Sequence, residues 1–150
     1  MELIKKQDSL VIIWEKKEVS FNDWIVMLDW LKLDFPWEYE KSWIMAHVIE
    51  KGWRMLFQIR FLDKIIWYIN YDDLEIDEEI VDFFWNIDIL LIKWSKNSIK
   101  TFENLEAKYV VPFWDQKDIF FSTLWQHPEV VDSIKIKELI SENEVIFVNI

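Results

Sequence analysis

The sequence WRMLFQIRFL at residues 53–62 is followed, two residues later, by IIWYINY at residues 65–71. In the first segment Trp, Met, Phe, Ile and Phe alternate with a second set that includes Arg and Gln, and such alternation indicates a strand with one buried face. The second segment is rich in β-branched and aromatic residues, which favour strands. We therefore predict an antiparallel hairpin with residues 63–64 in its turn. A two-residue turn there would place Arg60 opposite Trp67, where its guanidinium could sit over the ring.

Outward from this hairpin, the hydrophobic pattern predicts both strands and helices. The predicted strands cover residues 10–19, 108–114 and 144–150, and the predicted helices cover residues 20–33, 37–51 and 77–95. Gly52 is well placed as the left-handed stop of the second helix, and Pro112 favours an edge position for its strand. Residues 118–126 are compatible with a short helix or a loop, and residues 133–140 with a helix or a strand.

These elements predict an α+β fold, in which about three helices pack on a mainly antiparallel sheet with the hairpin at its centre. The chain has 150 residues, one Gly and three Pro. It contains no flexible linker, low-complexity segment or repeat, so residues 1–150 are expected to form a single globular domain.

The composition excludes several kinds of active site. The chain has no Cys, one Gly and two His, which excludes thiolate chemistry and Gly-rich phosphate loops. His47 and His127 are not part of an HxxxH or HExxH motif, so no zinc site is predicted. Residues 72–77 are acidic but lack the glycine of a calcium loop. We predict no catalytic residue, metal or cofactor, and a chain that is not an enzyme.

The sequence also bears on where the protein acts. No stretch approaches the roughly 20 apolar residues that a membrane helix needs, and the first residues do not form a secretory leader. The absence of Cys fits a reducing compartment. We therefore expect a soluble, cytoplasmic protein.

The charge pattern points to a binding surface. Of the 28 Asp and Glu residues that give the formal net charge of −11, several lie between residues 65 and 92, where there is no Lys or Arg. Aromatic residues flank these acids, and aromatic side chains are enriched where binding energy is concentrated. A negative field of this kind attracts cationic surfaces and repels nucleic acid. The predicted partner-binding residues are Asp72, Asp73, Glu75, Asp77, Glu78, Glu79, Asp82, Trp67, Tyr71 and Trp85.

In its size, acidity, aromatic content and lack of Cys and catalytic motifs, the chain resembles the small immunity proteins of bacterial toxin–immunity systems, including those of contact-dependent growth inhibition. The resemblance implies a protein whose acidic face docks on a basic toxin domain, such as a nuclease, and blocks its active site. Two alternatives stay open: a nucleic-acid mimic that inhibits a DNA-binding protein, and a hydrolase that uses two carboxylates. We expect no direct nucleic-acid binding and no membrane partner, and an exposed aromatic patch could equally serve a homodimer.

Overall fold

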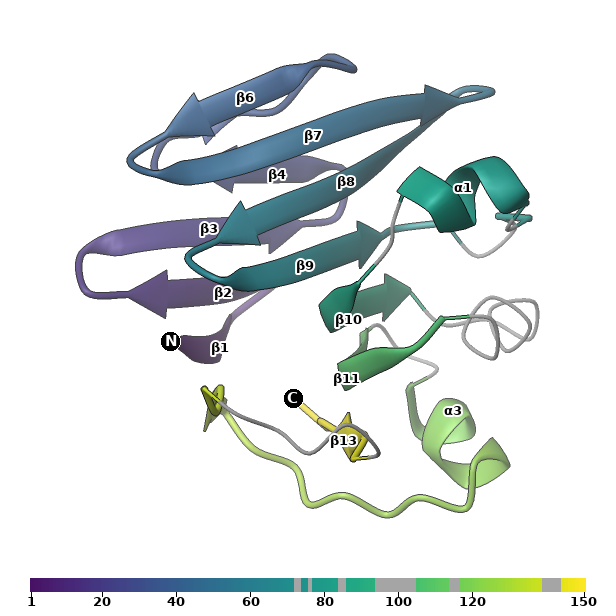
Figure 1. The fold of residues 1–150 in the computed structure, drawn as a ribbon. Helices are drawn as coiled ribbons and strands as arrows, with labels where there is room; N and C mark the ends of the chain where they lie inside the picture. Colours follow the sequence, from purple (N-terminus) through teal and green to yellow (C-terminus); the bar gives the residue numbers. More distant parts are fainter. Residues whose placement is uncertain (72–73, 76, 84–85, 94–104, 114–116, 139–143) are drawn as a thin grey trace.

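The protein is described by a computed structural model that covers residues 1–71, 74–75, 77–83, 86–93, 105–113, 117–138 and 144–150. Two β-sheets pack face to face, and short helices lie against the outer face of one of them (Figure 1). In the first sheet the strands run in the order β12 (Ser133–Lys135), β1 (Glu2–Lys6), β2 (Ser9–Trp14), β3 (Lys17–Asn22), β4 (Ile25–Leu28) and β5 (Leu31–Lys32). All pairings in this sheet are antiparallel.

The second sheet is mixed. Its strands run in the order β13 (Ile146–Phe147), β11 (Ala107–Phe113), β10 (Ile87–Lys93), β9 (Lys64–Ile69), β8 (Arg54–Phe61), β7 (Ile44–Lys51) and β6 (Glu38–Lys41). Strands β6 to β9 are antiparallel, whereas β9, β10, β11 and β13 are parallel to one another. In the described residues the helices are α1 (Glu78–Phe83), which lies between β9 and β10 in the chain, and α3 (Lys117–Thr123), which follows β11.

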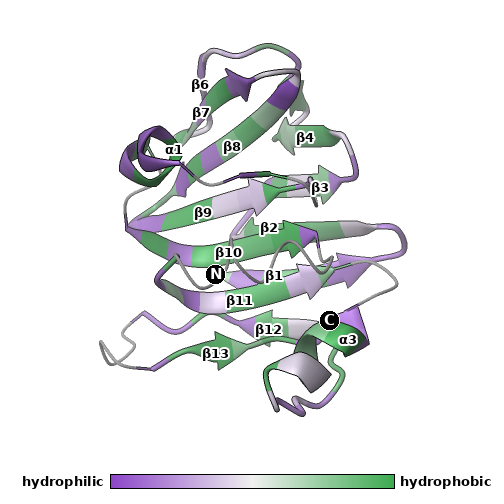
Figure 2. Ribbon diagram, turned by 90° about the vertical axis from the view of Figure 1, so that its right-hand side faces the viewer, coloured by the Kyte–Doolittle hydropathy of each residue, from purple (hydrophilic) through white to green (hydrophobic). Residues whose placement is uncertain are grey.

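The core has two parts, one on each face of the second sheet. Residues of both sheets, such as Ile12, Phe21 and Ile59, form the larger cluster between the sheets. Residues such as Trp67 and Leu90 point to the opposite face and pack against α1 and α3. Figure 2 shows hydrophobic residues along β2, β8 and β10, with hydrophilic residues at many of the strand ends and turns. A strand buried on both faces gains from apolar residues at every position, which explains the run Ile-Leu-Leu-Ile in β10.

The central hairpin is confirmed, but its register differs from the prediction. Phe61 pairs with Lys64, so the turn consists of residues 62–63 rather than 63–64. The shift places Ile65 opposite Arg60, and Gln58 opposite Trp67. The predicted stacking of Arg60 on Trp67 is therefore wrong.

The predicted helices at residues 20–33 and 37–51 are wrong. Both segments fold as β-hairpins, with β3, β4 and β5 in the first and β6 and β7 in the second. Their turns contain non-glycine residues with positive φ, including consecutive values of 57° at Ser42 and 67° at Trp43. Two successive positive φ values characterise the two-residue turns that close hairpins. Gly52, at φ 68°, occupies the β7–β8 turn instead of ending a helix.

The predicted helix at residues 77–95 is also wrong over most of its length. Among its described residues only Glu78–Phe83 is helical, and Ile87–Lys93 forms β10 in the middle of the second sheet. A continuous apolar run satisfies the helical period as well as that of a buried strand, so the pattern could not separate the two. The α+β prediction with about three helices is thereby corrected to a mainly β fold of two packed sheets.

The predictions for residues 108–150 are partly confirmed. Strand 108–114 is present as β11, but it lies between β10 and β13, so its predicted edge position is wrong. Strand β13 pairs only with Tyr109 and Val110. Pro112 therefore lies past the end of this partner strand, where its lack of a backbone N–H costs no hydrogen bond to β13. Residues 118–126 contribute to α3, residues 133–140 begin with β12, and residues 144–150 contain β13. No helix in the described part of the chain is long and apolar enough to cross a membrane.

Candidate functional site

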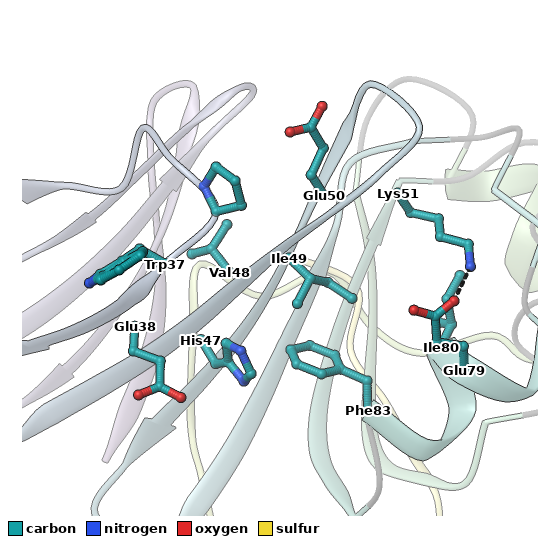
Figure 3. A pocket seen from close by; sticks show the side chains of 11 residues that line it. Trp37, Glu38, His47, Val48, Ile49, Glu50, Lys51, Glu79, Ile80 and Phe83 are labelled. Atoms are coloured by element: carbon teal, nitrogen blue, oxygen red, sulfur yellow. Dashed lines mark hydrogen bonds and ion pairs between the residues drawn. The ribbon is translucent and has the colours of Figure 1, made fainter.

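A groove of about 750 Å³ lies between α1 and the edge of the second sheet formed by β6 and β7. Its walls come from the segment before β6, from β7 and from α1 (Figure 3). Pockets of a few hundred to about 1,000 Å³ are typical of small-molecule sites. The groove is therefore large enough for a small ligand.

His47 lies in the middle of this groove. Alternation along β7 turns His47, Ile49 and Lys51 toward the face that α1 covers. The imidazole ring packs edge-on against Phe83, with the ring centroids 4.5 Å apart and the planes at 65°. Gln58, opposite His47 on β8, donates a hydrogen bond of 2.9 Å from Nε2 to the Phe83 carbonyl. These contacts hold the half-buried imidazole against α1.

Glu38 is the cross-strand neighbour of His47. The two residues are directly paired in the antiparallel ladder between β6 and β7. Such partners project from the same face with their Cβ atoms roughly 4.5–5.5 Å apart. In Figure 3 the Glu38 carboxylate and the Phe83 ring lie on either side of the His47 imidazole. The strand pairing thus places a carboxylate next to an imidazole in the groove.

Ionic contacts fasten α1 to β7 at the other end of the groove. Asp77 caps the helix, because its Oδ1 accepts a 3.0 Å hydrogen bond from the Ile80 N–H. Lys51 Nζ lies 2.8 Å from Asp77 Oδ2 and also pairs with Glu79. Hydrogen bonds to Asp77 and then to Glu79 raise the pKa of Lys51, and the hydrogen bond from Lys51 lowers the pKa of Asp77.

Replacing Lys51 with Met is expected to raise the pKa of Asp77 toward its ordinary value, because the largest cause of its depression is removed. The hydrogen bond from the Ile80 N–H remains, so the pKa of Asp77 should rise only part of the way to its ordinary value. A carboxylate with a depressed folded-state pKa stabilises the fold above its unfolded pKa and loses that contribution as pH falls through the folded value. The wild-type protein should therefore hold α1 in place to lower pH than the variant.

A carboxyl-detected NMR pH titration measures the shift in the pKa of Asp77, and Lys41→Met, at an exposed site on β6, is the control. An unchanged Asp77 titration in the Lys51 variant would contradict the ion pair.

The predicted partner-binding residues divide into three groups. Trp67 and Tyr71 are buried, with 0% and 8% of their surface exposed, so they are core residues and not anchors for a partner. Asp72, Asp73 and Trp85 lie outside the described residues. The remaining acids are exposed on or before α1: Glu75, Asp77, Glu78, Glu79 and Asp82. The Lys51 side chain partly neutralises this last group.

Sequence reasoning treated His47 as a half-buried helical residue and did not connect it with Glu38. In a helix of about 100° per residue, two positions nine apart point in opposite directions. The hairpin brings them together instead. The signal that could have revealed it is the alternation of Ile44, Ala46 and Val48, which are buried between the sheets.

The described residues do not supply a metal site. No group of three His, Cys, Asp or Glu side chains in the covered ranges could hold a metal ion. The chain has no Cys and two His, and His127 is exposed in the loop after α3, as expected from its place before Pro128. Zinc prefers several His or Cys ligands, and the described part of this chain offers no such set.

No protein-family model matches the sequence, and no curated protein matches it. A solved structure from Thermotoga maritima is similar in fold, with a TM-score of 0.77 over 100% of both chains and 12% sequence identity. That protein is described as a candidate Zn-dependent hydrolase of the metallo-β-lactamase superfamily. At this identity the likeness establishes the fold alone.

This likeness corrects the functional predictions. An immunity protein with an α+β fold and no enzymatic role was expected, whereas the chain has the two-sheet fold of a candidate hydrolase. The fold comparison therefore contradicts the predictions of an immunity protein and of a chain that is not an enzyme, but it does not itself assign an activity to this chain.

Proposed function

We propose that this chain is a hydrolase that acts on a small substrate in the groove between β7 and α1, without a bound metal ion. The pairing of His47 with Glu38 inside that groove is the observation that carries the proposal. The fold likeness to a candidate hydrolase supports it, as does the size of the groove. The proposal differs from the two-carboxylate hydrolase that the sequence left open, because its general base is an imidazole.

The chemistry follows from the two side chains. An imidazole is the side chain best suited to exchange a proton near neutral pH. His47 takes a proton from a water molecule as the water oxygen attacks a carbonyl or phosphoryl centre, and it then returns this proton to the leaving group as the bond to that group breaks. Glu38 orients the imidazole, and the edge contact with Phe83 limits its rotation.

The proposed step does not use zinc. The description of the structural neighbour names zinc, but the described residues of this chain do not bring together a ligand set for it. Activation of water therefore rests on the imidazole.

The proposal is tested by assaying the purified chain against ester, phosphoester and lactam substrates, with and without EDTA. We expect hydrolysis of at least one class, at a rate that EDTA does not change. Loss of activity in EDTA and its recovery with added Zn²⁺ would overturn the metal-free mechanism. No hydrolysis of any class above the uncatalysed rate would overturn the hydrolase itself.

Two further sequence predictions remain proposals. A reducing cytoplasm suits a chain without Cys, and the exposed acids Glu75, Glu78 and Asp82 suit contact with a basic protein surface. Neither is required for chemistry in the groove.

A further inference from the structure

We propose that a second cavity, at one end of the sandwich, binds a small aromatic carboxylate, whose anionic group lies between Lys5 and Lys117 and whose ring packs against the partly exposed Phe113. This site is separate from the groove that contains His47. It does not depend on the proposed hydrolase activity.

The cavity has a volume of about 480 Å³ and opens between the two sheets. The first sheet contributes the β1–β2 and β3–β4 turns, and the second contributes β9 and the end of β11. Strands β9 and β11 are both parallel to β10, and Phe113 is the last residue of β11. Ligands of sheets with parallel strands bind preferentially beyond the carboxyl ends of those strands. The position of the cavity therefore favours a binding site.

The floor of the cavity is aromatic: Phe113 is partly exposed there, and the buried rings of Tyr68 and Phe21 support it from beneath. Tyr68 and Phe113 are stacked, with centroids 5.4 Å apart and planes at 17°, and Phe21 lies 5.0 Å from Tyr68. The Tyr68 hydroxyl donates a 2.7 Å hydrogen bond to the Asp23 carbonyl, which fixes the ring. Burial raises the pKa of Tyr68, so its hydroxyl stays neutral at physiological pH. A neutral, fixed aromatic floor suits a flat apolar ligand.

Two lysines line the same cavity. Lys117 Nζ donates a 2.9 Å hydrogen bond to the Ile150 carbonyl, which holds the ammonium group in place. Burial lowers the pKa of Lys117, and repulsion from Lys5 lowers it further. An anion between the two ammonium groups would relieve this repulsion and form charge-assisted hydrogen bonds.

Among the described residues three acids also line the cavity and restrict the charge of the ligand. The Asp23 carboxylate accepts a 3.2 Å hydrogen bond from Asn70 Nδ2, so it already has a partner. Asp118 favours the charged form of Lys117, and Asp8 lies in the β1–β2 turn. These carboxylates would repel a dianion more strongly than a monoanion. A carboxylate therefore fits the cavity better than a phosphate dianion.

Isothermal titration calorimetry of the full chain tests the site with three probes. These are 1-naphthoate, its uncharged counterpart 1-naphthamide, and inorganic phosphate. We expect naphthoate to bind at least about tenfold more tightly than either of the others, the loss that removing one charge-assisted contact produces. Equal binding of naphthoate and naphthamide would overturn the role of the lysines. Tighter binding of phosphate would overturn the aromatic carboxylate.

Lysine variants test whether Lys5 and Lys117 contact the ligand or act only through the overall charge of the protein. Lys117→Met and Lys5→Gln should each weaken naphthoate binding about tenfold. Lys6→Gln is the matched control, because Lys6 follows Lys5 in β1 but pairs with Glu18 at 3.4 Å and does not line the cavity. Equal weakening in the Lys6 variant, or none in either test variant, would contradict the proposal. His47→Gln should leave naphthoate affinity unchanged, so failure of the hydrolase proposal and failure of this one are distinguishable.

Discussion

Replacing His47 with Gln is expected to lower kcat/KM by about 10²–10⁴-fold, the range that a general base contributes. Glutamine is close to histidine in size and still forms hydrogen bonds, but it cannot exchange a proton near neutral pH. Because Phe83 and the strand pairing hold position 47, the fold should survive the substitution. Steady-state kinetics on the best substrate of the panel measures the loss, and circular dichroism checks the fold.

The other histidine provides a matched control. His127 is exposed in a loop and does not line the groove, so His127→Gln should retain wild-type kcat/KM. Glu38→Gln should lower kcat more than it raises KM, because Glu38 positions the imidazole, and Glu38→Asp should recover part of the loss. Equal activity of the His47 and His127 variants would reject His47 as the proton-transfer group.

Replacing Trp67 with Ala is expected to lower the free energy of unfolding by about 3–5 kcal/mol, the usual cost of deleting a large buried aromatic side chain. Trp67 has 0% of its surface exposed and belongs to the cluster beneath α1 and α3, together with Leu56 and Leu90. The substitution leaves a cavity that the rigid second sheet cannot close. Urea denaturation monitored by circular dichroism measures the change.

Trp43, an exposed tryptophan of the same chain, is the control for the Trp67 substitution. It lies in the β6–β7 turn with 81% of its surface exposed. Trp43→Ala should therefore change the free energy of unfolding by no more than about 0.5 kcal/mol. A loss at position 43 as large as that at position 67 would contradict the assignment of Trp67 to the core and Trp43 to the surface.

The elements that were predicted correctly are those whose own residues carry a clear strand pattern. The hairpin of β8 and β9 combines alternation with β-branched and aromatic residues, so both strands were recognised. The hairpins of β4–β5 and β6–β7 were mistaken for parts of helices, since their turns use Asp29, Trp30, Ser42 and Trp43 at positive φ in place of glycine. Strand β10 was missed because its apolar run fits both periods.

The candidate site was harder to predict than the fold. The acidic cluster was visible in the sequence, but the ion pairs of Lys51 with Asp77 and Glu79 join residues far apart in the chain. The aromatic residues chosen as anchors, Trp67 and Tyr71, proved to be buried.

By itself, the sequence determined what chemistry is possible: with no Cys, one Gly and two His, it excludes thiolate sites and Gly-rich phosphate loops. Only the tertiary structure decided which of these residues meet. Glu38 and His47 would point apart on a helix, and a hairpin places them side by side. Likewise, the tryptophans at positions 43 and 67 are the same residue type, and only sheet packing decides which one water reaches. Such contacts depend on strand pairing between distant residues, which no local pattern encodes.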